Sequence, residues 1–239
     1  MSRLSVIIPV YNNAKNLLKC LQSLQQQTIF GLWPQQVEII VVDDGSISPI
    51  VIPDFILDDK IKTYHIAHAG AAKARNFGFA KSTGQYIFFC DSDVVFLKNN
   101  ALEKMLAMLE THTDKGYCYA AFKYGLKTFP LFPFDAEKLK HNNYISTMTL
   151  VRRSALEKLV FPNLPFDEAL KRFQDWDLWL ALLEKGETGV FLDEVLWQAQ
   201  VGGSMSKWLP KIFYKLFKNN LKVQEYQKAK ATMEKKYGL

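Results

Sequence analysis

Short apolar runs alternate with segments of helical periodicity through the first hundred residues. The runs expected to form strands are residues 4–10, 37–42, 61–66 and 85–90, and the first two are expected to be buried because they are short and rich in β-branched side chains. The segments expected to form helices are residues 13–27, where leucines recur on one stripe, and residues 70–80, where small side chains predominate. Strands that alternate with helices predict a parallel sheet built from βαβ units, and therefore an α/β fold.

The pattern changes after residue 99. Helical spacing returns at residues 101–111, 154–159 and 175–185, and an aromatic, proline-bearing stretch covers residues 117–134. We therefore expect an α+β half, residues 99–205, to be added to the βαβ half, residues 1–98, within one domain. A tail, residues 206–239, follows.

Composition and charge narrow the class of protein. The 239 residues are 49% hydrophobic and 23% charged, which is typical of a globular protein. The net charge of +6 comes from the tail, which holds nine lysines and two glutamates, so a nucleic-acid-binding core is not expected. No apolar run has the length of a membrane span, the first residues lead straight into a strand, and three scattered cysteines form no pair motif. We expect a reduced, cytoplasmic protein without a secretory signal.

Polar clusters follow three of the predicted strands. They are residues 9–12 (Pro-Val-Tyr-Asn), 43–46 (Asp-Asp-Gly-Ser) and 91–93 (Asp-Ser-Asp). Each alone is also explained as a turn or a helix cap. If the strands are parallel, however, all three open into one crevice at the carboxyl edge of the sheet, where α/β proteins bind ligands. Carboxylates gathered there favour a hard divalent cation with oxygen ligands.

Four ordered motifs resemble those of family 2 glycosyltransferases. They are residues 5–12 (SVIIPVYN), 41–46 (VVDDGS), 74–78 (ARNFG) and 90–93 (CDSD). Members of this family are inverting enzymes of the GT-A fold, and the resemblance runs from residue 5 to about residue 206. It implies that residues 1–98 bind a nucleotide sugar, that residues 99–205 bind the acceptor and carry the catalytic base, and that Mg²⁺ or Mn²⁺ is the cofactor.

The resemblance also implies roles for single residues of the first half. The nucleotide-binding residues would be Pro9, Tyr11, Asp44, Arg75 and Asp91, and the metal ligand would be Asp93. In the family's pattern Tyr11 stacks on the donor base, Asp44 accepts a hydrogen bond from the base, Arg75 lies near the nucleotide or its phosphates, and Asp91 lies near the ribose. A structural ion pair is the alternative for Arg75. Many members carry a further aspartate where Val94 stands, so that ligand is missing here.

The second half contains a segment that resembles the family's E-D-x-D-L-W motif. Residues 174–180 read Gln-Asp-Trp-Asp-Leu-Trp-Leu, which implies that Asp175 is the base that deprotonates the acceptor hydroxyl. Capping of the helix is the alternative for Asp175. Asp177 is expected to be a first-turn or hydrogen-bonding residue. Trp176 and Trp179 either line the acceptor site or belong to the core.

Two departures from the family pattern concern the acceptor side and the metal. Gln174 replaces the usual glutamate beside the base. Trp197 and Gln198 stand where the family commonly has Tyr-Arg, and Gln200 or Val201 stands where it has a histidine that helps to hold the metal and diphosphate. The four histidines do not occupy that position, and we expect His68 and the others to be surface or packing residues. Asp93, phosphate oxygens and water would then complete the coordination.

The tail has apolar residues at helical spacing between Trp208 and Leu221, flanked by lysines. One interpretation is a helix that docks on the catalytic body. The other, which we favour because lipid-linked acceptors are common in the family, is an interfacial helix that attaches the enzyme to the anionic inner face of the membrane.

The sequence therefore predicts an inverting, metal-dependent glycosyltransferase. It would move a sugar from a nucleoside diphosphate sugar, with UDP as the expected nucleotide, to a hydroxyl of a glycan or lipid-linked glycan. The alternative is a sugar-nucleotide-binding pseudoenzyme without transfer activity. The chain has no G-x-G-x-x-G after its first strand and no GxxxxGK[ST] motif, which disfavours a dinucleotide oxidoreductase and a P-loop NTPase. A nucleotidyltransferase would need a basic, glycine-rich loop after the first strand. Residues 11–14 (Tyr-Asn-Asn-Ala) contain neither glycine nor a basic residue, which disfavours this class as well.

Overall fold

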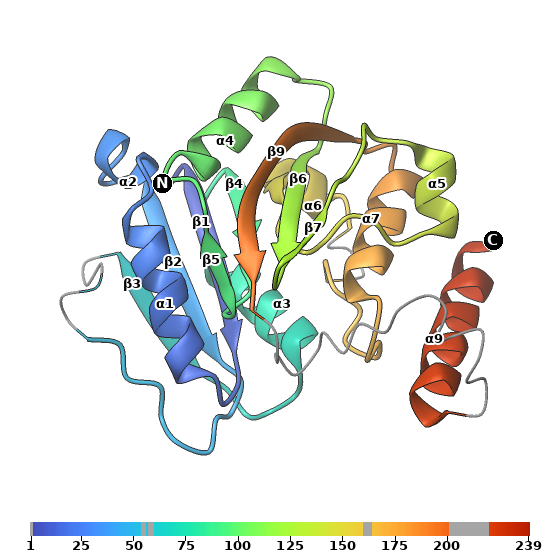
Figure 1. Cartoon of the computed structure of the whole chain (residues 1–239), viewed down its shortest axis with the longest axis horizontal. Coiled ribbons are helices and arrows are strands. Elements are labelled where there is room, and N and C mark those ends of the chain that lie inside the picture. Colours follow the sequence, from blue (N-terminus) through green and yellow to red (C-terminus); the bar gives the residue numbers. More distant parts are fainter. Residues whose placement is uncertain (1, 54–55, 57–59, 160–163, 201–219) are drawn as a thin grey trace.

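A computed structural model of the chain describes residues 2–53, 56, 60–159, 164–200 and 220–239, and its sheet begins with four parallel strands (Figure 1). These strands are β1 (Leu4–Val10), β2 (Val37–Asp43), β3 (Ile61–His65) and β4 (Tyr86–Phe89). They lie in the order β3-β2-β1-β4, and each neighbouring pair is parallel. The parallel sheet predicted from the apolar runs is confirmed.

The same sheet continues into a mixed half. Its strands are β8 (Leu150–Arg152), β6 (Tyr117–Tyr124), β9 (Gly189–Ala199) and β5 (Val94–Phe96), and β7 (Lys127–Phe129) pairs with β6. Strand β8 is antiparallel to β4, and β5 is antiparallel to β9 at the far edge. One sheet therefore runs through both predicted halves, and the division at residue 98 stays a prediction.

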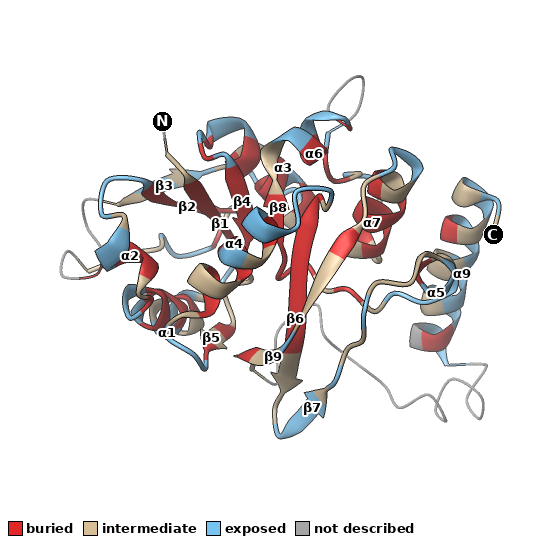
Figure 2. Ribbon diagram, turned by 90° about the horizontal axis from the view of Figure 1, so that it is seen from above, coloured by how far each residue is buried: buried red, intermediate tan, exposed pale blue. Residues whose placement is uncertain are grey.

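Helices cover both faces of the sheet. Helices α1 (Ala14–Gln25), α2 (Ile29–Leu32) and α4 (Ala101–Thr111) share one hydrophobic core with it. Helices α3 (Ala71–Lys81), α5 (Ala136–His141), α6 (Arg153–Glu157), α7 (Gln174–Glu184) and α9 (Leu221–Tyr237) contribute to the core on the other face. Strand β1 lies between the two layers: Val6 and Ile8 point into the first core and Ile7 into the second. Figure 2 shows this burial along the central strands.

Helix α3 lies unusually close to β1. A Cβ atom added to Gly78 would be 2.4 Å from Cγ2 of Ile7, so only glycine allows this approach. The close packing fixes the register of α3 on the sheet. It thereby fixes Arg75, one helical turn earlier, beside the carboxyl ends of the strands.

The described part of the tail packs on the body of the protein. Helix α9 buries Val223 and Met233 completely, and Met233 belongs to the same core as α7. Most of the apolar and basic stripe predicted between Trp208 and Leu221 lies outside the described residues, so membrane attachment stays a prediction. Within the described ranges, no helix combines the length and the apolar character needed to cross a bilayer.

Candidate active site

The carboxyl ends of β1, β2 and β4 meet at one edge of the sheet, as the motif positions predict. Val10 at the end of β1 pairs with Asp43 at the end of β2, while Ile7 pairs with Phe89 in β4. The loops after the strands are joined by hydrogen bonds. The backbone N–H of Asn12 donates to Oγ of Ser46 over 2.8 Å, and Nδ2 of Asn13 donates to Oγ of Ser92 over 3.4 Å. The three polar clusters therefore form one rim.

Tyr11 lies on this rim and is stacked against His68. The two ring centroids are 4.0 Å apart with an angle of 19° between the planes, and Tyr11 remains 40% exposed. Nδ1 of His68 lies 2.9 Å from the backbone oxygen of Asp44 and also 2.9 Å from its carboxylate. Because both partners are acceptors, the proton is placed on Nδ1. His68 is thus a half-exposed packing residue, as expected, and its packing partner Tyr11 lies on the rim.

Asp44 is buried and holds the loop that precedes α3. Its two carboxylate oxygens accept hydrogen bonds from the backbone N–H groups of Ala69 and Gly70, each over 2.9 Å. Gly45 permits the approach of this loop, because a Cβ atom there would be 2.6 Å from the backbone nitrogen of His68. The contact of Asp44 with a nucleobase stays a prediction.

Pro9 is a buried residue within β1 that pairs with Val42, and its contact with a nucleotide also stays a prediction.

Arg75 joins the two halves of the site. Its Nη2 donates to Oδ1 of Asp91 over 2.8 Å, and its Nη1 donates to Oε1 of Gln174 over 3.2 Å. Arg75 is 6% exposed. Asp91 follows β4, whereas Gln174 begins α7, so one buried positive charge lies between the donor-side carboxylates and the helix of the predicted base. The ion pair that was the alternative for Arg75 is present, and it lies at the rim.

Asp93 carries an unfavourably placed negative charge, because it is partly buried close to Asp91. Burial, and then the charge of Asp91, raise its pKa from 3.8 to about 6. Its backbone oxygen accepts a hydrogen bond from the backbone N–H of Gln200 over 3.0 Å, which brings the end of β9 to the D-x-D segment. Two crowded carboxylates suit a hard cation. Within the described ranges, however, no three His, Cys, Asp or Glu side chains are grouped as metal ligands.

Asp175 lies in the first turn of α7 and is not its cap, because the N-cap position is occupied by Phe173. Asp175 is therefore not the N-cap residue, although its carboxylate accepts a backbone N–H of the first turn. Nδ2 of Asn143 donates to Oδ1 of Asp175 over 3.0 Å, and the backbone N–H of Trp176 donates to the same oxygen over 2.9 Å. Burial raises the pKa of Asp175, although these two hydrogen bonds and the charge of Arg75 oppose the increase. Asn143 has no counterpart among the residues that the motifs single out.

The remaining residues of the α7 motif have structural roles. Trp176 and Trp179 are 1% and 0% exposed, and their ring N–H groups donate to the backbone oxygens of Leu139 and Ile145. The core interpretation of both tryptophans is confirmed. Asp177 accepts a hydrogen bond from the hydroxyl of Tyr237 over 2.7 Å, as expected for a hydrogen-bonding residue.

The segment expected to hold the metal-binding histidine is described only in part. Trp197 is fully buried in the core, and Nε2 of Gln198 donates to the backbone oxygen of Gly125 over 2.9 Å. Val201, one of the two residues that stand for the histidine, lies outside the described residues.

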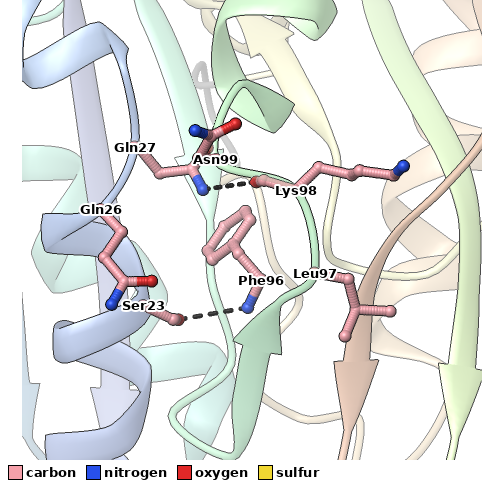
Figure 3. A pocket seen from close by; sticks show the side chains of 7 residues that line it. All are labelled: Ser23, Gln26, Gln27, Phe96, Leu97, Lys98 and Asn99. Atoms are coloured by element: carbon pink, nitrogen blue, oxygen red, sulfur yellow. Dashed lines mark hydrogen bonds between the residues drawn. The ribbon is translucent and has the colours of Figure 1, made fainter.

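A shallow pocket lies away from this rim (Figure 3). It is lined by Ser23, Gln26 and Gln27 at the end of α1, by Phe96 at the end of β5, and by Leu97, Lys98 and Asn99 after it. Helix α1 begins beside the rim and ends at this pocket, so the length of the helix separates the two. Nε2 of Gln27 donates to the backbone oxygen of Lys98, which ties the two segments together. The pocket is therefore part of the structural link between α1 and α4, and it is not included in the site.

A parallel βαβ half that continues into a mixed sheet, with acidic residues at the ends of its central strands, defines the GT-A fold of nucleotide-sugar-dependent glycosyltransferases. The chain belongs to glycosyl transferase family 2, whose family model matches residues 5–160.

Curated relatives and solved structures agree with this assignment. A glycosyltransferase of Haemophilus influenzae is 32% identical over 70% of this chain and 69% of the relative. A glycosyltransferase of Rickettsia conorii is 28% identical over 87% of this chain, and the chain spans about a third (34%) of that relative's length.

Two solved structures share the fold. TarS 1–349 of Staphylococcus aureus in complex with UDP-GlcNAc has a TM-score of 0.69 and 20% identity, and the match covers 91% of this chain and 65% of that one. A mannosyltransferase of Pyrobaculum calidifontis in complex with GDP-Man and Mn²⁺ has a TM-score of 0.59 and 15% identity, covering 86% and 58%.

Proposed function

We propose that the chain transfers a sugar from a nucleoside diphosphate sugar, with UDP as the nucleotide, to an acceptor hydroxyl with inversion at the anomeric carbon. The observation that carries the proposal is the position of Arg75 between Asp91 and the first turn of α7. The buried guanidinium of Arg75 then lies between the donor-side carboxylate of Asp91 and the helix that carries the candidate base. The complexes of TarS with UDP and UDP-GlcNAc support the choice of nucleotide.

The donor side would bind the nucleotide along the rim. The nucleobase stacks on the face of Tyr11 that His68 leaves free, since an aromatic ring with one covered face offers the other. Asp44 orders the loop beneath the base, and Asp91 lies near the ribose. Arg75 provides positive charge close to the phosphates, while its ion pair with Asp91 keeps the guanidinium in place.

The acceptor side would use Asp175 as the general base. Both hydrogen bonds to this carboxylate end on Oδ1, so Oδ2 is the oxygen expected to take the acceptor's proton. As the proton moves to Oδ2, the acceptor oxygen attacks the anomeric carbon and the nucleoside diphosphate leaves from the opposite face. A raised pKa suits this role, because a base is most effective when its pKa is near the working pH.

Asp93 would be the protein ligand of the cation, with Asp91 close by at the ribose. The donor set fits a hard divalent ion, because the raised pKa of Asp93 reflects buried negative charge that such an ion would offset. Diphosphate oxygens and water would complete its coordination. When bound, Mg²⁺ or Mn²⁺ offsets the charge that develops on the departing diphosphate.

Donor binding is the first test of the proposal. Calorimetry of the purified protein with UDP-sugars and GDP-sugars, with Mn²⁺ and with a chelator, is expected to show binding that favours UDP. Binding of no nucleotide sugar under either condition would contradict the proposal. Donor binding that never leads to transfer would favour the pseudoenzyme instead. The reasons to consider it are Gln174 beside the base, and Gln200 or Val201 in place of the histidine.

The substitution Gln174→Glu is expected to raise the pKa of Asp175. The substitution places a second carboxylate one residue before the base. The new carboxylate also partly neutralises Arg75, whose positive charge lowers the pKa of Asp175. The acidic limb of the kcat profile against pH should move to higher pH by about 1 unit or less, since the pair is partly screened. An unchanged limb would show that Gln174 is electrostatically remote from the base.

A further inference from the structure

The helix that carries the proposed base begins on a strained residue. Phe173, the N-cap of α7, has φ 61° and ψ 26°, which is the left-handed region that a bulky side chain rarely adopts. Such a conformation persists only where the surroundings fix it. The Phe173 ring packs edge-on against Trp176 within α7 and against Tyr226 of α9, with centroids 5.4 and 5.2 Å apart. Helix α9 is thus one of the elements that hold this turn.

Polar contacts from α9 reach the same turn. Asp177, two residues after Asp175, is 3% exposed. One of its carboxylate oxygens accepts the hydroxyl of Tyr237 over 2.7 Å and lies 2.6 Å from Nζ of Lys236. The hydroxyl of Tyr237 is also 3.0 Å from the backbone oxygen of Asp177. A buried carboxylate with a hydroxyl and an ammonium group as partners fixes the backbone that bears it.

Two further ion pairs extend this attachment along α9. Nη2 of Arg172, the residue before the strained Phe173, lies 3.3 Å from Oε2 of Glu225. Nζ of Lys236 also lies 3.0 Å from Oδ2 of Asp167. Contacts from both ends of α9, at residues 225–226 and 236–237, therefore converge on residues 167–177. Figure 1 shows α9 beside α7 at the side of the molecule away from β3.

We propose that α9 is a positioning element for the acceptor side of the site: through Asp177 and Phe173 it sets the first turn of α7, and with it the carboxylate of Asp175. The inference rests on the proposed function, in which Asp175 is the base. Lys236 and Tyr237 touch neither donor nor acceptor in this scheme. They act through the backbone of α7, whose carboxylate must be placed to a fraction of an ångström.

The test uses two substitutions of nearly unchanged size and one matched control in the full chain. Lys236→Met removes the ammonium group that pairs with Asp177, and Tyr237→Phe removes the hydroxyl. Lys235→Met makes the same chemical change as the first at an exposed neighbouring position of α9. Lys236→Arg restores the positive charge. For each protein the kcat for sugar transfer, the Kd for the donor and the rate of amide hydrogen exchange across residues 173–178 are measured.

The proposal predicts a separation of the three measurements. Lys236→Met and Tyr237→Phe should each lower kcat about tenfold, less than the roughly 10²-fold loss that a 1 Å misplacement produces. Donor Kd should stay within about twofold, and exchange across residues 173–178 should become about tenfold faster. Lys235→Met should match the wild type, and Lys236→Arg should recover most of kcat. A purely structural role would instead weaken donor binding and kcat together.

Each contrary result has a distinct meaning. Unchanged hydrogen exchange in Lys236→Met and Tyr237→Phe overturns the positioning role of α9, whatever the activity. Equal kcat in Lys236→Met and Lys235→Met overturns its effect on the base. If the wild-type chain transfers no sugar while exchange still becomes faster, the proposed function fails and the attachment of α7 by α9 stands.

Discussion

Asp175→Asn is expected to lower kcat for sugar transfer by about 10²–10⁴-fold, the range that a general base contributes. The amide oxygen can still accept the hydrogen bonds from Asn143 and the backbone of Trp176, so the turn keeps its shape. The amide cannot take the acceptor's proton. Donor Kd should therefore stay within about twofold of the wild type, and single-turnover assays with saturating donor should show the loss in the chemical step.

A surface aspartate provides the control for this substitution. Asp114 is paired with Lys115 and its side chain is 70% exposed, so Asp114→Asn removes a carboxylate without touching the site. Its kcat and donor Kd should equal those of the wild type. Full activity in Asp175→Asn would show that another group deprotonates the acceptor. A parallel loss of donor binding would show that Asp175 serves the donor pocket.

Asp93→Asn is expected to remove the gain in donor affinity that Mn²⁺ provides. An amide is a weaker ligand for a hard cation than a carboxylate, and few other protein ligands are at hand in the described part of the site. Calorimetry of the variant with Mn²⁺ should give the Kd that the wild type shows in EDTA. A variant that keeps its response to Mn²⁺ would place the cation elsewhere.

The same substitution should stabilise the metal-free protein, with an effect that depends on pH. Burial and Asp91 raise the pKa of Asp93 to about 6 in the folded chain, against 3.8 for the unfolded group. A raised carboxyl pKa contributes stability that is present below pH 3.8 and is lost as the pH rises through about 6. The amide of the variant does not titrate, so the variant loses no stability at this position over the same pH window.

Thermal unfolding in EDTA should therefore show a higher Tm for Asp93→Asn than for the wild type at pH 8, and nearly equal values at pH 4. A shift of about 2–4 °C corresponds to 1 kcal/mol in a domain of this size. Equal Tm values for the variant and the wild type at pH 8 would show that burial and the charge of Asp91 do not destabilise the ionised Asp93.

The sequence predicted the parallel half of the fold well, because its central strands β1, β2 and β4 are mostly apolar and buried. Strands β1 and β2 are buried on both faces and carry no polar interruption apart from Ser5 and Glu38 before the aspartate that ends β2. The mixed half was harder to predict. Strand β9 includes Asp193 and Glu194 in mid-strand, and its register with β6 is irregular, so it has neither a clear alternation nor an apolar run.

The candidate site was predicted where motifs mark it and missed where only the fold assembles it. Tyr11 and His68 stack although they follow different strands, and a lone histidine after a strand carries no signal for such a contact. Asn143 reaches Asp175 from a loop before β8. The attachment of α9 depends on Tyr237, whose hydroxyl has no evident partner in the sequence until Asp177 is placed beside it. Contacts between residues far apart in the chain leave no local sequence motif, so they could not be predicted before the fold was known.

Sugar transfer by this chain can be measured directly as the release of nucleoside diphosphate in the presence of acceptors. The purified protein is incubated with Mn²⁺, a UDP-sugar that it binds and a panel of glycan and lipid-linked acceptors, and UDP release is measured beside the Asp175→Asn variant. We expect acceptor-dependent UDP release, a β-linked product from an α-linked donor, and loss of release in the variant. Donor binding without acceptor-dependent release, or release that Asp175→Asn leaves intact, would contradict this expectation.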